Sequence, residues 1–241
     1  MPGLGTVINV AGILIGGLIG LLFGRVMKEQ LQETLCRTCG VCVLFIGIAG
    51  GMSGMLSIGE DGLTSGHSML LIGCLAIGAL IGELLNIEGG FERFGEWLKQ
   101  KTGNAKDARF VDGFVTASLT VCVGAMAIVG SIEDGIAGDW SILATKGILD
   151  LIIVLVMTCS MGKGCIFSAI PVAAVQGSVT ALAVLVRPLM TDAAISNLSF
   201  IGSVMIFCVG MNLIWGKQIR VANLLPAVLL AIGSAFLPFA L

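Results

Sequence analysis

Residues 1–24 read MPGLGTVINVAGILIGGLIGLLFG, and this stretch decides the fold because it contains no Asp, Glu, Lys or Arg. About 20 apolar residues of α-helix are enough to cross the hydrocarbon core of a bilayer. Another apolar stretch, at about 141–161, contains only Lys146 and Asp150 as charged residues. Six further stretches of 20 or more residues lack all four charged types: 38–59, 62–82, 113–132, 164–186, 193–216 and 221–241.

These stretches predict helices rather than strands. Strands of outer-membrane barrels alternate apolar and polar residues, whereas these stretches are apolar almost throughout. A helix also satisfies its backbone polar groups within its own segment, which lipid requires. We therefore predict an all-α, polytopic membrane protein with one transmembrane domain, residues 1–241, and about eight helices. Their expected ranges are 5–24, 38–58, 68–87, 110–130, 142–161, 164–186, 198–216 and 221–240.

The composition agrees with a membrane protein and excludes other classes. Of the 241 residues, 56% are hydrophobic and 12% are charged, whereas soluble domains carry about 25% charged residues. The net charge of −2 gives no basic surface, so we expect no nucleic-acid partner. The expected partners are the lipid bilayer and a small-molecule or ion substrate.

The distribution of positive charge predicts the topology. Eleven of the 13 Lys and Arg residues lie in the first, third, fifth and seventh connections between the expected helices, and only Lys146 and Arg187 lie elsewhere. The positive-inside rule places these connections in the cytoplasm and both termini outside. The N-terminus has no positive region before the first apolar stretch, so we expect that stretch to be retained as a helix.

Two segments have the pattern of amphipathic helices. In 89–101, Phe91, Phe94, Trp97 and Leu98 share one helical face and charged residues occupy the rest. This pattern favours a helix on the cytoplasmic membrane surface, although packing against the protein's own cytoplasmic side explains it equally well. Segment 28–37 has a weaker form of the same pattern.

Cysteine and histidine do not predict a metal or catalytic site. Cys36, Cys39 and Cys42 are spaced three apart, but a zinc site usually needs four ligands, and the single histidine, His67, lies in another loop. Cysteine in apolar stretches behaves as a small hydrophobic residue. Without a nucleophile–histidine pair we expect no enzyme activity, no cofactor and no bound metal.

An internal repeat is a further hypothesis. Residues 8–46 align with 170–208 without a gap, and Arg25 matches Arg187. The repeats would span about 5–87 and 164–241, joined by connecting helices at about 108–161. The offset of five helices would give the copies opposite orientations, as in many secondary transporters. Chance similarity between apolar helices is the alternative.

Glycine recurs at every fourth position of the first stretch, at Gly12, Gly16, Gly20 and Gly24. Small residues at this spacing allow two helices to approach closely. The glycine face predicts tight packing either inside the monomer or between the subunits of a homodimer.

Polar residues inside 110–130 provide the first candidate binding site. Asp112, Thr116 and Thr120 are four residues apart and share one helical face. Carboxylate and hydroxyl oxygens suit a cation or an ammonium group. In the alternative interpretation, Asp112 caps the helix and the threonines bond to their own backbone.

Asp150 provides the second candidate, because an ionisable group inside a span predicts function. We expect Asp150 and Asp112 to face one hydrated cavity and to bind a proton or a cation. In the alternative, Asp150 lies near the outer interface and pairs with Lys146, one turn before it.

Six other polar residues complete the candidate site. Asn9, Gln176, Ser178 and Asn212 lie inside predicted spans, where interhelical hydrogen bonding is their alternative role. Glu133 and Asp134 lie in a predicted outer loop, 131–135, and would form either an acidic mouth that attracts cations or an ordinary turn.

Several motifs together resemble one family. They are CVGAMAIVGSIEDGIAGD at 122–139, GTVINVAGILIGGLIG at 5–20, GELLNIE at 82–88, RFVDGFVTASL at 109–119, FSAIPV at 167–172, QGS at 176–178 and GMNL at 210–213. The chain resembles, over nearly its whole length, the bacterial membrane proteins catalogued as domain of unknown function 554. The resemblance implies a polytopic protein of the bacterial inner membrane and no established reaction. Ala125 stands where the resemblance implies proline in many members, which would alter a kink there.

These observations predict a secondary transporter of an ion or a small polar solute, more specifically a cationic one. A channel or passive pore that uses the same polar face is the first alternative. A scaffold or sensor subunit that transports nothing is the second alternative, although short connections and the lack of a soluble domain argue against it.

Overall fold

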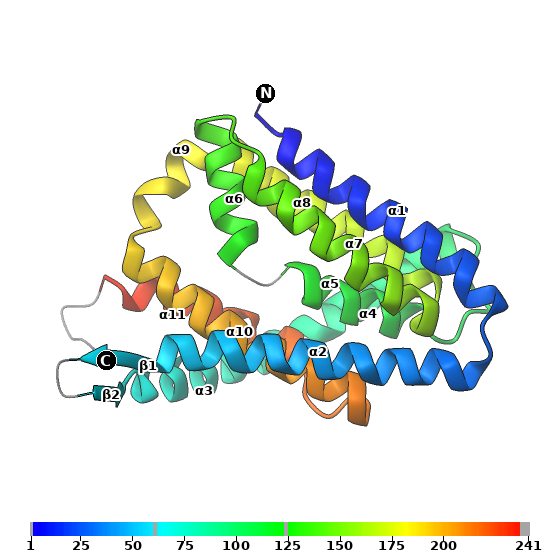
Figure 1. Cartoon of the computed structure of the whole chain (residues 1–241), viewed down its shortest axis with the longest axis horizontal. Helices are drawn as coiled ribbons and strands as arrows, with labels where there is room; N and C mark the ends of the chain where they lie inside the picture. Colours follow the sequence, from blue (N-terminus) through cyan, green and yellow to red (C-terminus); the bar gives the residue numbers. More distant parts are fainter. Residues whose placement is uncertain (1, 60–61, 123–124, 237–241) are drawn as a thin grey trace.

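The computed structural model describes residues 2–59, 62–122 and 125–236, and helices make up most of these ranges (Figure 1). Within these ranges there is one β-hairpin, in which β1 and β2 are antiparallel and Leu56 pairs with Ser65. The helices and strands are α1 (Leu4–Val26), α2 (Glu29–Met55), β1 (Leu56–Gly59), β2 (Gly62–Ser65), α3 (Ser68–Leu85), α4 (Ile87–Lys101), α5 (Phe110–Cys122), α6 (Ala125–Ile136), α7 (Ser141–Met161), η1 (Lys163–Ser168), α8 (Ala169–Ala181), α9 (Ala183–Val186), η2 (Arg187–Leu189), α10 (Asp192–Trp215), η3 (Val221–Leu224) and α11 (Leu225–Ser234).

Six helical segments of the described ranges are long and apolar enough to cross a bilayer, and α5 with α6 makes a seventh if the bent pair is one span. The prediction of an all-α, polytopic membrane protein is confirmed. The number eight stays a prediction, because the helical segment Val221–Ser234 is shorter than the other spans. Its expected continuation to residue 240 falls on 237–241, which lie outside the described residues.

Successive connections lie at opposite ends of the helix bundle. In Figure 1, the α1–α2 and α4–α5 connections lie at one end, and the β-hairpin and the α6–α7 connection lie at the other. This alternation is the one that the positive-inside argument requires, since its basic connections share one end. The orientation of the two ends in a membrane stays a prediction.

Three expectations about local structure were wrong. Segment 28–37 is not a separate surface helix, because it forms the first turns of α2, whose 27 residues span about 40 Å. The end of the predicted helix 38–58 is instead the β-hairpin. The predicted helix 110–130 is two helices that differ by 62° in direction, and the second continues to Ile136.

The amphipathic pattern of 89–101 corresponds to a separate helix, α4. Leu98 is buried, and the Phe94 ring lies 5.8 Å from the ring of Phe114 on α5. Trp97 on the same helix is 52% exposed. The helix therefore packs against the protein's own helices and also presents an aromatic residue outward.

The glycine face of α1 packs against α7 inside the monomer. A Cβ atom added at Gly12 would lie 2.6 Å from the backbone oxygen of Gly147, and one at Gly16 would lie 2.3 Å from that of Leu151. Gly20 and Gly24 meet the backbone of α7 one and two turns further on. The face that we considered for a homodimer is thus used within one chain, and a dimer formed by other helices stays a prediction.

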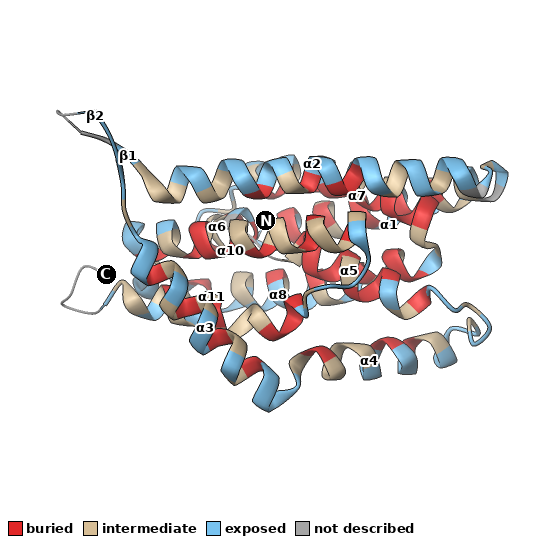
Figure 2. Cartoon of the chain, turned by 90° about the horizontal axis from the view of Figure 1, so that it is seen from below, coloured by how far each residue is buried: buried red, intermediate tan, exposed pale blue. Residues whose placement is uncertain are grey.

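The core centres on α5, as Figure 2 shows by its buried residues. Phe110 and Phe114 of α5 are fully buried, together with Met157 of α7 and Met205 of α10. Large apolar side chains on the outer helix faces are exposed, for example Leu84 at 78%. An apolar exterior of this kind suits contact with lipid.

The helices of the two proposed repeats contact their counterparts. Helix α1 packs against α8, α2 against α10, and α3 against α11. This arrangement is compatible with two copies that face one another. The inverted repeat and its boundaries nevertheless stay a prediction.

Candidate functional site

A cavity of about 210 Å³ lies beside α5 and is bounded by α2, α4, α7, α10 and the segment that follows α10. The apolar part of its lining includes Val115, Leu119 and Leu213. Its polar lining combines two predicted site residues on α5 with residues from α4 and from the end of α10. The polar side chains are Glu88, Glu92, Asp112, Thr116, Asn212 and Lys217.

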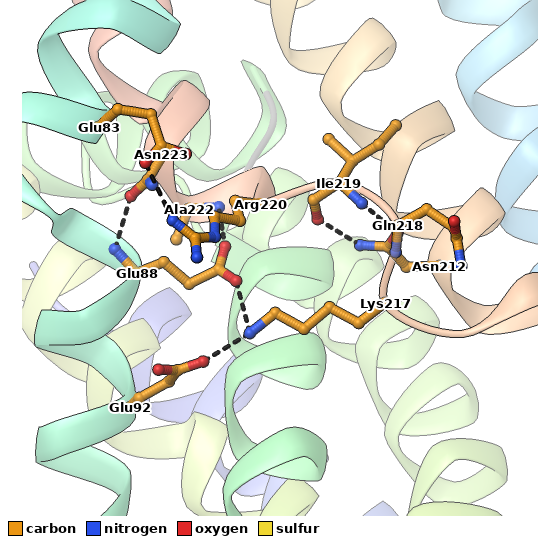
Figure 3. A network of polar contacts seen from close by, with 10 residues as sticks. All are labelled: Glu83, Glu88, Glu92, Asn212, Lys217, Gln218, Ile219, Arg220, Ala222 and Asn223. Carbon is orange, nitrogen blue, oxygen red and sulfur yellow. Dashed lines mark hydrogen bonds and ion pairs between the residues drawn. The ribbon is translucent and has the colours of Figure 1, made fainter.

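The lining of this cavity carries more negative than positive charge. Lys217 is the one basic residue among the described residues that line the cavity. Its Nζ lies 2.7 Å from Glu88 Oε1 and 2.5 Å from Glu92 Oε1 (Figure 3). Asp112 is exposed to the cavity and takes part in none of the ion pairs among the described residues. Three carboxylates against one ammonium favour a bound cation, and Asp112 is the carboxylate available to bind it.

A network of polar contacts builds the wall of the cavity by joining the α3–α4 elbow to the segment after α10 (Figure 3). The backbone N–H of Glu88 donates to Asn223 Oδ1 at 2.8 Å, and Ala222 N–H donates to Glu88 Oε2 at 3.3 Å. Arg220 pairs with Glu83 at 3.0 Å. These contacts link segments more than 130 residues apart, so they hold α4 and its two glutamates against the cavity.

Asn212 supports this wall rather than offering its side chain to a ligand. Its Nδ2 donates to the carbonyl oxygen of Ile219 at 2.7 Å, and its Oδ1 accepts from the N–H groups of Gln218 and Ile219 (Figure 3). These bonds occupy the amide in shaping the turn after α10. The hydrogen bonds of Asn212 are therefore structural, but they close the turn after its own helix instead of joining two helices as the alternative interpretation expected.

The predicted polar face of α5 divides between two environments. Asp112 and Thr116 line the cavity. Thr120 is buried and donates to the carbonyl oxygen of Thr116 at 2.7 Å, which is the back-bonding alternative. The candidate binding face is therefore limited to Asp112 and Thr116.

Asp150 lies apart from this cavity, so the expectation of one cavity for Asp112 and Asp150 was wrong. Asp150 is 3% exposed and Lys146 is 7% exposed. The Lys146 Nζ lies 2.8 Å and 2.7 Å from the two carboxylate oxygens. The pairing matches the alternative interpretation of Asp150, but the pair is buried rather than near an exposed interface.

Three of the remaining candidates are buried and one is exposed. Asn9 and Gln176 are 0% and 1% exposed, and their amide atoms have no hydrogen-bond partner among the described residues. Ser178 is exposed and bonds to the backbone of its own helix. The predicted loop 131–135 is the end of α6, where Asp134 is fully buried and accepts from Gly5 N–H at 3.0 Å. Asp134 is therefore not part of an exposed mouth.

Glu133, by contrast, is half-buried near the end of α6. Its position leaves its proposed role at the outer mouth as a prediction. Sequence reasoning missed Glu88, Glu92 and Lys217 as lining residues. The motif GELLNIE ends at Glu88 and is the one signal that the sequence offers, whereas the pattern of 89–101 places Glu92 only among the charged residues outside the aromatic face of that helix.

Lys217 gives the cavity wall a pH dependence. Burial alone would lower the pKa of Lys217, but the Glu88 and Glu92 carboxylates outweigh it and raise the pKa above its ordinary value of 10.5. The stabilisation of the folded protein by the ion pairs of Lys217 with Glu88 and Glu92 is therefore complete below pH 10.5, and it is lost as the pH rises through the raised pKa.

We expect Lys217→Met to lower the free energy of unfolding by no more than about 1 kcal/mol at neutral pH, because the Lys217 side chain is 49% exposed. Thermal unfolding of the purified protein at several pH values measures this difference. The unfolding temperatures of the wild-type and Lys217→Met proteins should become equal at pH values above the raised pKa of Lys217. A difference that persists there would contradict an ionic cause.

The comparisons with known proteins identify one family and two relatives. The family model described as "Protein of unknown function (DUF554)" matches residues 4–236. The "Uncharacterized membrane protein YdfK" of Bacillus subtilis (strain 168) is 27% identical over 226 residues, which cover 94% of this chain and 93% of the relative. The "Uncharacterized protein YqgA" of Escherichia coli (strain K12) is 26% identical over 232 residues, which cover 95% and 94%. No solved structure matches the chain.

Proposed function

We propose, from the premise that this chain belongs to the DUF554 family of proteins of unknown function, that it is a secondary transporter of a small cation or cationic solute. The observation that supports this proposal most directly is the cavity beside α5, where Asp112 faces a lining of net negative charge. A carboxylate at such a position attracts and binds a cation. The proposal assigns no catalytic reaction to the chain.

The broken helix α5–α6 supports transport over a purely structural role. Helix α5 ends at Cys122, α6 begins at Ala125, and the two differ by 62° in direction. Transporters commonly bind substrates where a membrane-spanning helix is interrupted. The cavity lies along α5, so a change in the angle between α5 and α6 would alter the surroundings of Asp112 and Thr116.

The cavity volume narrows the class of substrate. Pockets for drug-sized ligands have volumes of about 300–1,000 Å³, whereas this cavity has about 210 Å³. The proposed substrate is therefore an inorganic cation or a small amine. The polar residues that line the cavity would replace part of the water that surrounds such a cation in solution.

Close packing at the opposite end of the bundle favours a carrier over the channel alternative. There, Gly5 contacts both Leu143 and Asp134, and Asp134 is fully buried. A carrier needs one end closed while the other is open, and an open pore does not. We also propose that the protein lies in the bacterial inner membrane, as the family resemblance implies, and that the positive-inside rule orients it with the cavity toward the cytoplasm and both termini outside.

Flux into proteoliposomes tests the role of Asp112. Uptake of Na⁺, K⁺ and methylammonium by the wild-type protein identifies a transported probe. We expect Asp112→Asn to reduce the uptake of that probe at least 10-fold, on the order of the loss of one charge-assisted contact. Asp192→Asn serves as the control because Asp192 is an exposed carboxylate in the first turn of α10.

The form of the flux distinguishes the alternatives. Saturable uptake with counterflow supports a carrier, whereas single-channel currents would support a pore. Equal uptake by wild-type and Asp112→Asn proteins would overturn the assignment of the site. No uptake of any of the three probes by the folded wild-type protein would overturn the proposed substrate class.

A further inference from the structure

The buried ion pair between Lys146 and Asp150 is not explained by the cavity. Both side chains are more than 90% buried within α7, a helix long and apolar enough to cross a bilayer. A buried ion pair contributes less stability than apolar residues of similar size, because both charges lose their hydration. Ionisable groups inside spans accordingly tend to serve proton or ion movement.

Asn9 of α1 lies next to this pair. A Cβ atom added at Gly147 would lie 3.2 Å from Asn9 Cα, so Asn9 packs against α7, and its side chain adjoins the Asp150 carboxylate. The residue is fully buried. An amide can donate to a carboxylate and can equally accept from a protonated carboxyl group. Asn9 is therefore suited to both protonation states of Asp150.

A second carboxylate lies toward the other side of Lys146. Asp134 of α6 accepts from Gly5 N–H through Oδ2, while its buried Oδ1 has no partner among the described residues. A Cβ atom added at Gly5 would lie 3.1 Å from Asp134 Oδ2 and 2.8 Å from Leu143 Cβ, so Asp134 lies near Leu143. Leu143 precedes Lys146 by three residues, on the same face of α7.

The preferred direction of a helical side chain favours movement of Lys146 toward Asp134. Long side chains on a helix lean toward its N-terminus, which is the direction of Leu143 and Asp134. In the structure the Lys146 ammonium instead points forward to Asp150. Its alternative partner therefore lies in the direction that the backbone favours.

We propose, building on the proposed transport function, that Asp150 binds the proton that drives transport and that Lys146 then exchanges Asp150 for Asp134. A hydronium ion gives its proton to the Asp150 carboxylate: one O–H bond of the hydronium breaks, a new O–H bond forms on Asp150, water is released, and no electrons are transferred. The Lys146 ammonium keeps its own proton and pairs with Asp134 Oδ1. The side-chain oxygen of Asn9, Oδ1, accepts a hydrogen bond from the new O–H group of Asp150.

This exchange of ion-pair partners would affect both the closed end of the bundle and the cavity, because the bent helix pair α5–α6 connects them. Asp134 contacts Gly5 at the closed end, so a new partner for Asp134 changes the packing of α6 against α1. Helix α6 follows α5, whose last described residue, Cys122, lies within electrostatic range of Lys146 and Asp150. Asp112 of the cavity lies on the same α5.

In the part of the chain that the structure describes, few other titratable groups surround the pair. Those that face this region are Cys122 from α5 and Asp134 from α6, while α1 contributes the neutral Asn9. Helix α2 and η1 bring Cys36 and Cys165 to the other end of α7, beside Ser160 and Thr158. The protonation of Asp150 must therefore be measured separately from that of Asp134 and Cys122.

Labelling with dicyclohexylcarbodiimide tests the proposal without any transport, because this reagent modifies protonated carboxyl groups in apolar surroundings. Purified protein in detergent is labelled between pH 5 and 9, and mass spectrometry of its peptides measures modification of Asp150. We expect wild-type labelling to increase as the pH falls. Lys146→Met should increase the labelling at pH 7 at least 5-fold, since no ammonium keeps the carboxyl group ionised.

The variant Asp134→Asn isolates the exchange of partners. Without a second carboxylate, Lys146 stays with Asp150, so labelling of Asp150 should fall at least 3-fold at the same pH. Asp192→Asn is the matched control and should label as the wild type does. Asp134→Asn also keeps the test decisive if Lys146→Met fails to fold.

Three results would overturn the proposal: equal labelling of folded wild-type and Lys146→Met proteins, unchanged labelling in Asp134→Asn, or protection of Asp150 by Na⁺ at constant pH. The last result would assign the site to a metal cation instead of a proton.

These outcomes are separate from those that test the proposed transport function. Correct labelling with no cation flux would contradict transport alone, and cation flux that is independent of a pH gradient would contradict proton coupling alone.

Discussion

A Gly16→Leu variant is expected to lose its native helix packing, because no space exists for a side chain between α1 and α7. Even the first carbon atom would lie 2.3 Å from the backbone oxygen of Leu151. A backbone atom cannot move aside by a change of rotamer, so the two helices would have to separate. Overpacking against movable side chains costs about 1–3 kcal/mol, and we expect a larger loss here.

Gly73→Leu is the matched control. Gly73 lies inside α3, and a Cβ atom added there would meet no atom of the described residues within 4 Å. The same substitution in a similar helix therefore adds a side chain without a clash. Size-exclusion chromatography and thermal unfolding in detergent compare the two variants. A Gly16→Leu protein that unfolds at the wild-type temperature would show that α1 and α7 are not packed as described.

The glycine face also shows what the sequence can and cannot predict about packing. The spacing of Gly12, Gly16, Gly20 and Gly24 predicted a close helix contact, and that contact exists. The spacing contains no information about the partner, because any helix that approaches closely satisfies it. The internal partner α7 appears only when the chain is folded, and packing inside the monomer is the one of the two alternatives that the structure shows for this face.

The spans were predictable because each depends on a local property, the length of an apolar stretch. The bend between α5 and α6 was not predicted, although the resemblance had suggested that residue 125 matters for a kink. Segment 28–37 was misjudged because its charged residues made it look separate, whereas helical hydrogen bonding continues through it into α2. Polarity marks where a helix leaves lipid and does not mark where the helix begins.

The candidate site was predictable only in its local part. Helical periodicity correctly brought Asp112 and Thr116 to one face, but it could not show that Thr120 bonds to its own backbone. Glu88 and Lys217 join the cavity through contacts between segments 129 residues apart in the chain. No periodicity connects such distant residues, so these two were missed.

Removal of Lys146 alone is expected to destabilise the protein strongly. In Lys146→Met the Asp150 carboxylate keeps its burial and loses its only ion-pair partner among the described residues. Removing one member of a buried ion pair costs about 3–5 kcal/mol. Part of this cost is avoided when the carboxyl group takes up a proton, so the destabilisation should diminish as the pH is lowered.

The double variant Lys146→Met with Asp150→Leu separates the cost of an unpaired charge from the cost of altered packing. Replacing both members of a buried pair by apolar residues is often neutral or stabilising by about 1–4 kcal/mol. We therefore expect the double variant to unfold at or above the wild-type temperature, while the single variant unfolds well below it. Such a protein would be stable yet unable to bind the proton, which is the expected property of a pair retained for function. If the double variant is as unstable as Lys146→Met, the pair stabilises the fold through the shape of its two side chains. That result would contradict a functional reason for the two charges in α7.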